Sequence, residues 1–221
     1  MDVHVVTPLN ASHYASELEQ NYRLRHRIFV ERMHWEALRR ADGREIDQYD
    51  ACDATHLLLV RNEQVVGGLR FNSLSGPNLL TGQFSRMVSR RLPDSVWLGA
   101  DWTRFYVIER PQPLGPSSAA GALYCSAMEY ALLQGWTYLT FVSKPAMVEI
   151  LVSIGWSVTP LGMPEVIEGD LAVAAYIAVS EEALLRARMF CGQPASLLRD
   201  RSGGADLPQR HEPAARAVTV H

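Results

Sequence analysis

Apolar residues recur along this chain with two periods, and these periods separate predicted strands from predicted helices. Runs rich in β-branched and aromatic residues predict strands at 2–6, 55–61, 64–71, 102–108, 137–142, 156–160 and 171–179. Apolar residues three or four positions apart predict helices at 10–33, 84–91, 117–134, 145–154 and 181–190. Strands followed by helices predict an α/β fold, a single-domain three-layer sandwich in which helices cover a mixed sheet.

The connections between these elements indicate which strands are neighbours and where the domain ends. Asn62 and Glu63 separate the second and third strands and predict a hairpin. The helix at 117–134 makes strands 102–108 and 137–142 candidate parallel partners. From Gly192 onward Ser, Gly, Pro, Arg and Asp dominate. We therefore expect residues 1–191 to form the domain and residues 192–221 to be a disordered tail with no catalytic part.

The first helix has a charged residue on its apolar stripe. Arg25 takes a position where the helical period calls for an apolar side chain, and Phe29 follows one turn later. A charge at such a position needs a wet cleft or a partner. Trp35 follows at the helix end, and Asp47 and Asp50 lie in the polar segment after it. Each residue alone has an ordinary interpretation, as solvated face, core or turn, so the grouping carries more weight than any member.

Two strands carry further candidate chemistry. In strand 64–71, Arg70 falls on the face opposite Val65, Leu69 and Phe71, beside glycines that let another group approach the backbone. An ordinary outward-facing arginine is an equally good interpretation of Arg70 taken alone.

The geometry of strand 102–108 decides whether Asp101 and Arg104 can serve one site. Strict alternation places Asp101 and Arg104 on opposite faces of the strand. If both residues serve one site, the strand needs a bulge near Thr103 to redirect one of the two side chains.

Composition narrows the class of protein. With 48% hydrophobic and 20% charged residues the chain can build a full core, which excludes global disorder. A formal net charge of −3 gives no basic field for nucleic acid or acidic lipid. The chain shows no run long enough to span a membrane and no signal-peptide pattern at its start. Cys52, Cys125 and Cys191 lack metal-ligand spacing, so we expect reduced cytoplasmic thiols and no metal site.

Four local strings together resemble a known family: LRHRIFVERMHW, GREIDQYD, VVGGLRF and TRFYV. Their order and spacing over about residues 1–180 are similar to those of the LuxI-type acyl-homoserine-lactone synthases. The positions that carry the resemblance are Arg25, Phe29, Trp35, Asp47, Asp50, Arg70, Phe84 and Arg104. It implies a fold similar to the GCN5-related N-acyltransferases. It also implies a quorum-sensing signal made from S-adenosylmethionine and an acyl thioester, with acyl carrier protein or coenzyme A as donor and no prosthetic group.

The resemblance also implies roles for individual residues. Asp101 stands where the family has a glutamate, and we expect it to act as the base that accepts the proton of the methionyl amine. Phe29 and Trp35 are expected to pack on the adenine or the sulfonium. Asp47 and Asp50 are expected either to hold the substrate ammonium or to order the loop. In the second case they act through the candidate catalytic arginines, Arg25, Arg70 and Arg104. Phe84 is equally consistent with a substrate contact and with plain core.

The acyl pocket is less clearly indicated. Thr140 matches a family position associated with 3-oxo-acyl chains, although threonine is also simply a good strand former. Trp102 replaces a small residue of many members, which predicts a shortened pocket for short, branched or aromatic acyl groups and slightly favours coenzyme A as the donor. Further candidates for the lining are Met128, Val142, Ser143 and Leu151.

Two alternatives stay open at this point. The first is a GCN5-like N-acyltransferase acting on another amine, but Pro113 and Pro116 fit a pyrophosphate-binding loop at 112–117 poorly because they lack N–H groups. The second is a degenerate synthase that binds ligands without turnover, which only the aspartate at position 101 favours.

Overall fold

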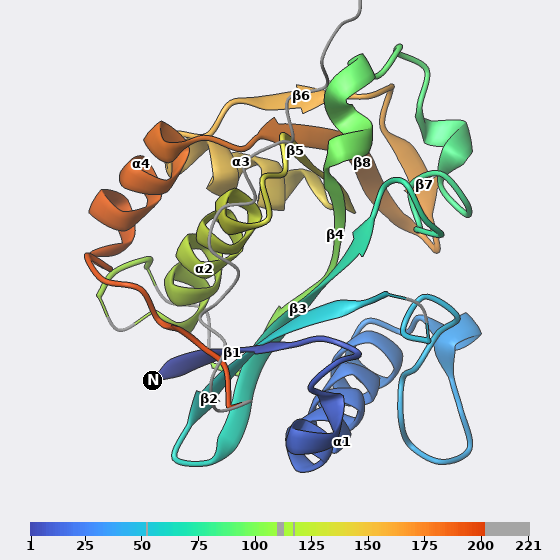
Figure 1. Cartoon of the computed structure of the whole chain (residues 1–221). Coiled ribbons are helices and arrows are strands. Elements are labelled where there is room, and N and C mark those ends of the chain that lie inside the picture. The colour runs from blue at the N-terminus through green and yellow to red at the C-terminus, as the bar shows by residue number, and fades with distance from the viewer. Residues whose placement is uncertain (52, 110–112, 117, 202–221) are drawn as a thin grey trace, which may run out of the picture.

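A single mixed β-sheet forms the centre of the molecule (Figure 1). The computed structural model describes residues 1–51, 53–109, 113–116 and 118–201. Its strands follow the order β6-β8-β5-β4-β3-β2-β1-β9, and β7 pairs with β8. Their bounds are β1 Asp2–Val6, β2 Thr55–Arg61, β3 Gln64–Ser73, β4 Ala100–Val107, β5 Tyr138–Ser143, β6 Val158–Pro160, β7 Glu165–Ile167, β8 Asp170–Ala178 and β9 Leu198–Arg199.

Helices cover both faces of this sheet, which confirms the predicted three-layer α/β fold. They are α1 Ala15–Arg25, α2 Ala119–Leu133, α3 Pro145–Ser153 and α4 Glu181–Cys191. Figure 1 shows α1 on one side of the sheet and α2 and α4 on the other. The main core lies on the α2 side, where Leu57, Leu69 and Phe71 of the sheet join Leu123 and Ala127 of α2.

The hairpin of β2 and β3 turns at Asn62 and Glu63, as predicted. Both residues have positive φ angles of about 50–60°, a conformation that matches the twist of a tight hairpin. The register shifts between Leu59 and Val60, so β3 carries an irregularity near its start. Val65 therefore packs on the α1 side with Leu24 and Phe29. The expectation that Val65 shares a face with Leu69 and Phe71 was wrong, because alternation does not continue through a bulge.

Strands β4 and β5 are parallel neighbours, as predicted, but they pair over only two positions. Ala100 lies opposite Leu139 and Asp101 opposite Thr140, and beyond these residues the strands diverge. The predicted bulge near Thr103 is also present. Between the β3 partners Gly68 and Arg70, β4 contains one residue more than its neighbour, and Arg104 has a φ of 54°.

Several boundaries differ from the prediction. Helix 10–33 consists of a 3-10 turn at Ala11–Tyr14, then α1, then a π-helical stretch at His26–Arg32. Asn10, directly before the 3-10 turn, makes no capping hydrogen bond with its side chain, which accepts the N–H of Thr7 and donates to the carbonyl of Val5. Of the predicted helix at 84–91 only a 3-10 turn at Ser85–Met87 forms.

The boundary predicted at Gly192 was wrong. Residues 192–201 continue along the domain, and β9 pairs in parallel with β1 through Val3–Leu198 and His4–Arg199. The backbone N–H of Arg201 donates to the hydroxyl of Tyr14. Leu198 is buried and Leu197 packs against the main core, so two leucines hold this segment to the domain, and composition alone does not reveal such an anchor. Residues 202–221 lie outside the described residues.

Candidate active site

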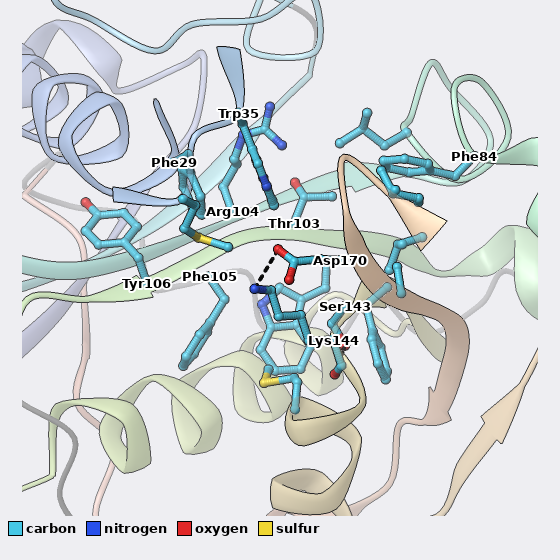
Figure 2. Close-up of a pocket in the computed structure, with 18 of the residues that line it drawn as sticks. Phe29, Trp35, Phe84, Thr103, Arg104, Phe105, Tyr106, Ser143, Lys144 and Asp170 are labelled. Atoms are coloured by element: carbon cyan, nitrogen blue, oxygen red, sulfur yellow. Dashed lines mark hydrogen bonds and ion pairs between the residues drawn. The ribbon is translucent and has the colours of Figure 1, made fainter. Parts of the chain in front are cut away.

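A cavity of about 320 Å³ opens where β4 and β5 diverge (Figure 2). The lining comes from the end of the π-helical stretch, from β4, from the end of β5 and from the β7–β8 hairpin, and the half-exposed Lys144 and Asp170 lie at its rim. Predicted site residues that line it are Phe29, Trp35, Phe84, Asp101, Trp102, Arg104, Val142 and Ser143. The bulge of β4 is what brings Asp101 and Arg104 to one cavity.

Asp101 is a buried carboxylate with an anchored position. One oxygen accepts the hydroxyl of Thr140 at 3.0 Å, and the other accepts the backbone N–H of Leu80 at 3.1 Å. Burial raises the pKa of Asp101 to about 6, and the hydrogen bonds from Thr140 and Leu80 oppose this rise. Asp101 is thus a carboxylate that is mainly ionised near neutral pH but binds a proton more readily than an exposed aspartate.

Beside the cavity, three arginines and three carboxylates form one network of ion pairs. Arg25 donates from Nε to Glu45 at 2.5 Å and from both terminal nitrogens to Asp50 at 2.6 and 2.8 Å. The Arg25 side chain is 1% exposed, and its guanidinium lies 5.5 Å from the ring centre of Tyr22. The charge on the apolar stripe of the first helix therefore has partners, as burial requires.

Arg70 and Arg104 complete the network. Arg70, which is 0% exposed, donates to both oxygens of Asp47 at 2.6 and 3.1 Å and to Thr103 at 3.1 Å. Arg104 donates to both oxygens of Glu45 at 3.1 and 3.0 Å and to Asp47 at 2.7 Å. Each carboxylate of the network therefore receives hydrogen bonds from at least one guanidinium group, and the formal charges cancel.

The charges in the network stabilise each other's ionised forms. Burial alone would raise the pKa of Glu45, but the neighbouring charges of Arg25 and Arg104 hold that pKa below its ordinary value. His56 lies 3.7 Å from Asp50, yet burial lowers its pKa to about 3, so it is neutral at physiological pH. The network is therefore a fixed electrostatic scaffold near neutral pH.

Four predicted site residues lie behind the cavity wall and not in it. Arg25, Arg70, Asp47 and Asp50 are absent from the described lining, and within the network only Arg104 reaches the cavity. Arg25 and Arg70, expected to be catalytic, thus have the geometry of positioning residues. Of the two roles considered for the aspartates, ordering of the loop fits this geometry.

Glu45 is a site component that sequence reasoning missed. It is fully buried and joins Arg25 to Arg104. In the sequence it is one of several acidic residues interleaved with arginines, and nothing local singles it out. A stoichiometric argument would have found it: the three candidate site arginines, Arg25, Arg70 and Arg104, need three carboxylates if they are buried, and Glu45 is the next carboxylate before Asp47 in the same polar segment.

Aromatic rings form the other part of the site. Phe29 and Trp35 stack with ring centres 5.2 Å apart and an interplanar angle of 15°. The guanidinium of Arg104 lies 5.7 Å from the centre of the Phe29 ring. Figure 2 shows Phe29, Trp35 and Arg104 on the same side of the cavity, with Phe84 separate from them. This side offers aromatic faces next to an ion-paired guanidinium, a suitable surface for a cationic or planar ligand.

Trp102 forms the apolar end of the cavity. It is 3% exposed and packs edge-to-face with Phe105, Tyr124, Phe141 and Trp156 at ring-centre distances of 5.6–6.4 Å. Its indole N–H has no hydrogen-bond partner among the described residues. The indole therefore fills space that a smaller side chain would leave open to the cavity.

Three residues predicted to line the acyl pocket do not line this cavity. Met128 and Leu151 are fully buried in the core on the α2 side. The hydroxyl of Thr140 donates to Asp101, and Thr140 does not line the cavity. Gln112 and Ser117, the ends of the alternative pyrophosphate loop, lie outside the described residues, as does Cys52.

The described residues bear on the compositional predictions in two ways. They contain no group of three or more His, Cys, Asp or Glu side chains that could hold a metal ion. Across the same residues, the helices are too short or too polar to cross a membrane. Cys125 and Cys191 are free, buried thiols.

Comparison with known proteins decides the family. The autoinducer synthase family model matches residues 10–187. The chain belongs to this family. The isovaleryl-homoserine lactone synthase of Bradyrhizobium diazoefficiens is 32% identical over 216 residues, covering 98% of this chain and 92% of the relative. The resemblance predicted from the four sequence strings is confirmed, and the chain is an acyltransferase of the acyl-homoserine-lactone synthase type.

Solved structures of synthases in this family agree. BjaI, a CoA-dependent acyl-homoserine lactone synthase solved with SAM and isopentyl-CoA, aligns with a TM-score of 0.83 and 31% identity over 93% of this chain and 96% of BjaI. MesI, also CoA-dependent, aligns with a TM-score of 0.78 and 28% identity over 91% of this chain and all of MesI. An acyl-CoA N-acyltransferase from Pseudomonas aeruginosa, at 13% identity, a TM-score of 0.52 and 80% and 99% coverage, shows the shared fold alone.

Proposed function

We propose that this synthase joins S-adenosylmethionine to a short or branched acyl group carried by coenzyme A, and that Asp101 is the base of the reaction. One observation carries this proposal: the divergence of β4 from β5, together with the bulge at Arg104, brings Asp101, Arg104 and Trp102 to a single cavity. A cytoplasmic location stays a prediction from the sequence.

The choice of donor rests on the relatives and on Trp102. A relative with 32% identity is an isovaleryl-homoserine lactone synthase, and the similar solved structures BjaI and MesI are CoA-dependent. The buried indole of Trp102 shortens the apolar end of the cavity, which favours a compact acyl group. Acyl carrier protein is the other donor to be tested.

S-adenosylmethionine fits the side of the cavity that holds Phe29 and Trp35. Its sulfonium is a cation and its adenine is planar, and both suit an aromatic face. Arg104 lies next to this stack and its charge is already balanced by Glu45 and Asp47. We assign to Arg104 the contact with the carboxylate of the substrate and to the network behind it the task of holding Arg104 in place.

The first step forms an amide. The neutral α-amine of S-adenosylmethionine attacks the thioester carbonyl, the C–S bond breaks, and the thiolate of coenzyme A leaves. Asp101 accepts the proton of the amine, directly or through water, and that proton then goes to the thiolate. A free α-amino group has a pKa near 8, so a base whose pKa is about 6 is adequate.

The second step closes the lactone. The substrate carboxylate attacks its own γ-carbon, the bond to the sulfonium breaks, and methylthioadenosine leaves as a neutral thioether. No proton is transferred in this step, so correct positioning of the carboxylate supplies most of the rate. This requirement explains why so many buried ion pairs stand behind one arginine of the cavity.

The aspartate at position 101 is compatible with this chemistry. Its side chain is one methylene shorter than the family glutamate, but Thr140 and Leu80 hold its two oxygens in defined directions. We infer that a water molecule spans the added distance to the amine.

The test is a set of reactions of the purified chain with S-adenosylmethionine. The donors are isovaleryl-CoA, straight-chain acyl-CoA thioesters and the matching acyl carrier protein thioesters. We expect an acyl-homoserine lactone and methylthioadenosine in equal amounts, fastest with a short or branched acyl-CoA. Amide products without methylthioadenosine would instead support an N-acyltransferase acting on another amine. Binding of S-adenosylmethionine with no product from any donor would support a synthase without turnover.

A further inference from the structure

The cavity rim holds the only lysine of this chain. The remaining basic residues of the 21 Lys and Arg are arginines, so Lys144 is unique in chemistry as well as in place. It follows the last residue of β5, directly before α3, and it lines the cavity. Its ammonium forms an ion pair with Asp170 at 2.7 Å, and Figure 2 shows this pair among the lining residues.

The ion pair joins two parts of the rim that are far apart in sequence. Asp170 begins β8, directly after the β7–β8 turn, where Glu168 and Gly169 both have positive φ angles. Lys144 and Asp170 are 48% and 45% exposed, so the pair costs little to open and contributes little to stability. Such a pair can exchange one partner for a ligand anion.

The proposal rests on the proposed function, because it concerns the acyl donor. We propose that Lys144 binds the phosphate at the end of the donor's pantetheine arm, and that Asp170 is the ion-pair partner of Lys144 when no donor is bound. That phosphate is attached to the same oxygen of pantetheine in both donors: in coenzyme A it is part of a diphosphate, and in an acyl carrier protein it is a diester with a serine.

The strand geometry places Lys144 at a suitable distance from the reacting atoms. Asp101 pairs with Thr140, and Lys144 lies four residues further along the chain, about 13 Å at the usual rise of a strand. The extended pantetheine arm that separates a thioester from its phosphate is of comparable length. A thioester near Asp101 thus brings the phosphate to the level of Lys144.

The other cations of the cavity are less suitable. Arg104, which pairs with Glu45 and Asp47, is already assigned to the carboxylate of S-adenosylmethionine. Arg32 comes from the end of the π-helical stretch, next to Trp35, on the side that we assign to S-adenosylmethionine. Lys144 lies next to Ser143, on the wall that β5 contributes.

The rim also supplies a matched control. Arg86 forms an ion pair with Glu165 of β7 at 2.9 Å, so it too ties the β7–β8 hairpin to a neighbouring segment. Arg86 does not line the cavity. Arg86→Met therefore removes a tether of the hairpin without removing a cation from the donor site.

The test compares ligands with and without phosphate. Binding of coenzyme A, of 4′-phosphopantetheine and of pantetheine, which lacks the phosphate, is measured by calorimetry for wild type, Lys144→Met, Lys144→Arg, Asp170→Asn, Arg32→Met and Arg86→Met. We expect Lys144→Met to weaken the binding of coenzyme A and of 4′-phosphopantetheine about five- to tenfold and to leave pantetheine binding unchanged. Lys144→Arg should restore most of the loss, and Asp170→Asn should tighten coenzyme A binding because it removes a competing negative charge.

Turnover then identifies the source of the phosphate and separates the two proposals. KM is compared for acyl-CoA, acyl carrier protein and acyl-N-acetylcysteamine thioesters; the last carries no phosphate. A rise in KM with Lys144→Met confined to phosphate-bearing donors supports the proposal, and the donor affected is its source. The two proposals can also fail separately. If the wild type binds coenzyme A but makes no lactone, and Lys144→Met loses that binding, the phosphate site is supported and the proposed reaction is contradicted.

Three results would overturn the assignment of Lys144. The first is unchanged coenzyme A binding in Lys144→Met. The second is an equal loss for pantetheine and coenzyme A. The third is an equal or larger loss in Arg32→Met or Arg86→Met, which would place the phosphate elsewhere or assign the effect to movement of the hairpin.

Discussion

The two faces of strand β4 carry different kinds of side chain, polar and charged on one face and aromatic on the other. On one face Asp101, Thr103 and Arg104 meet charged groups and hydrogen-bond donors from β3, β5 and the segment at 45–50. On the other face Trp102 and Phe105 pack against the rings of α2 and β5. The strand thus separates a network of charges from a cluster of aromatic rings, and the cavity touches both.

The two faces should respond differently to amino-acid substitutions. Removing one member of a buried ion-pair network leaves an opposite charge buried without a partner, so damage to the charged face is large. The aromatic face is held by contact area and shape, so its response is graded with volume. We therefore expect the charged face to decide whether the reaction occurs and the aromatic face to decide which acyl group is used.

The largest expected effect is at Arg25. Arg25→Ala leaves Glu45 and Asp50 short of a partner and should lower the free energy of unfolding by about 3–5 kcal/mol. Lysine should not rescue it, because it cannot reproduce two bonds to Asp50 and one to Glu45. Denaturant unfolding checks this. The control is Arg23→Ala, two residues earlier, whose exposed pair with Glu19 should be worth less than about 1 kcal/mol. Equal losses in the two variants would contradict the distinction between buried and exposed pairs.

Asp101→Asn should separate activity from stability. The substitution removes the base and should lower kcat by a factor of about 100 or more. Folding raises the pKa of Asp101 from 3.8 to about 6, so the ionised form destabilises the wild type above pH 6, and this cost disappears as the pH falls below 4. Asn should therefore raise the free energy of unfolding by up to about 3 kcal/mol at neutral pH and by little at pH 4. An unchanged rate would exclude Asp101 as the base.

Trp102→Leu probes the aromatic face. The smaller side chain should extend the cavity toward α2 and shift the preferred donor to longer acyl-CoA thioesters, at a stability cost of a few kcal/mol. Trp156→Leu is the control, because Trp156 is buried in the same ring cluster but does not line the cavity. Competition among acyl-CoA thioesters, followed by mass spectrometry, reports the change. A longer-chain preference in both variants would attribute the effect to general loosening of the core.

The smallest expected effect is at Thr140 of β5, which pairs with Asp101 of β4. The hydroxyl of Thr140 lowers the pKa of Asp101, so Thr140→Val should raise this pKa further above 6. The acidic limb of the kcat profile should then move to higher pH, while the preference for 3-oxo donors stays unchanged. A changed 3-oxo preference with an unmoved pH profile would restore the role first predicted for Thr140.

The same two faces differ in how far the sequence predicts them. Alternation and helical spacing predicted most strands, the layers and the parallel pair, because each of these depends on local pattern. The bulge followed from requiring Asp101 and Arg104 to share a site. Glu45 was missed, and Arg25 and Arg70 were expected to be catalytic although they lie behind the cavity wall. How deeply a polar loop is buried depends on its ion pairs with residues distant in sequence, and local pattern does not indicate these pairs. The short strands β7 and β9 were missed for the same reason.

The most direct measurement is the release of methylthioadenosine and free thiol by the purified chain with S-adenosylmethionine and isovaleryl-CoA, followed across pH for wild type and Asp101→Asn. We expect equal amounts of the two products from the wild type, with a rate that falls on the acidic side of pH 6, and a nearly complete loss in Asp101→Asn. Thiol released without methylthioadenosine, or a pH profile shared by both proteins, would contradict the assignment of Asp101 as the base of lactone synthesis.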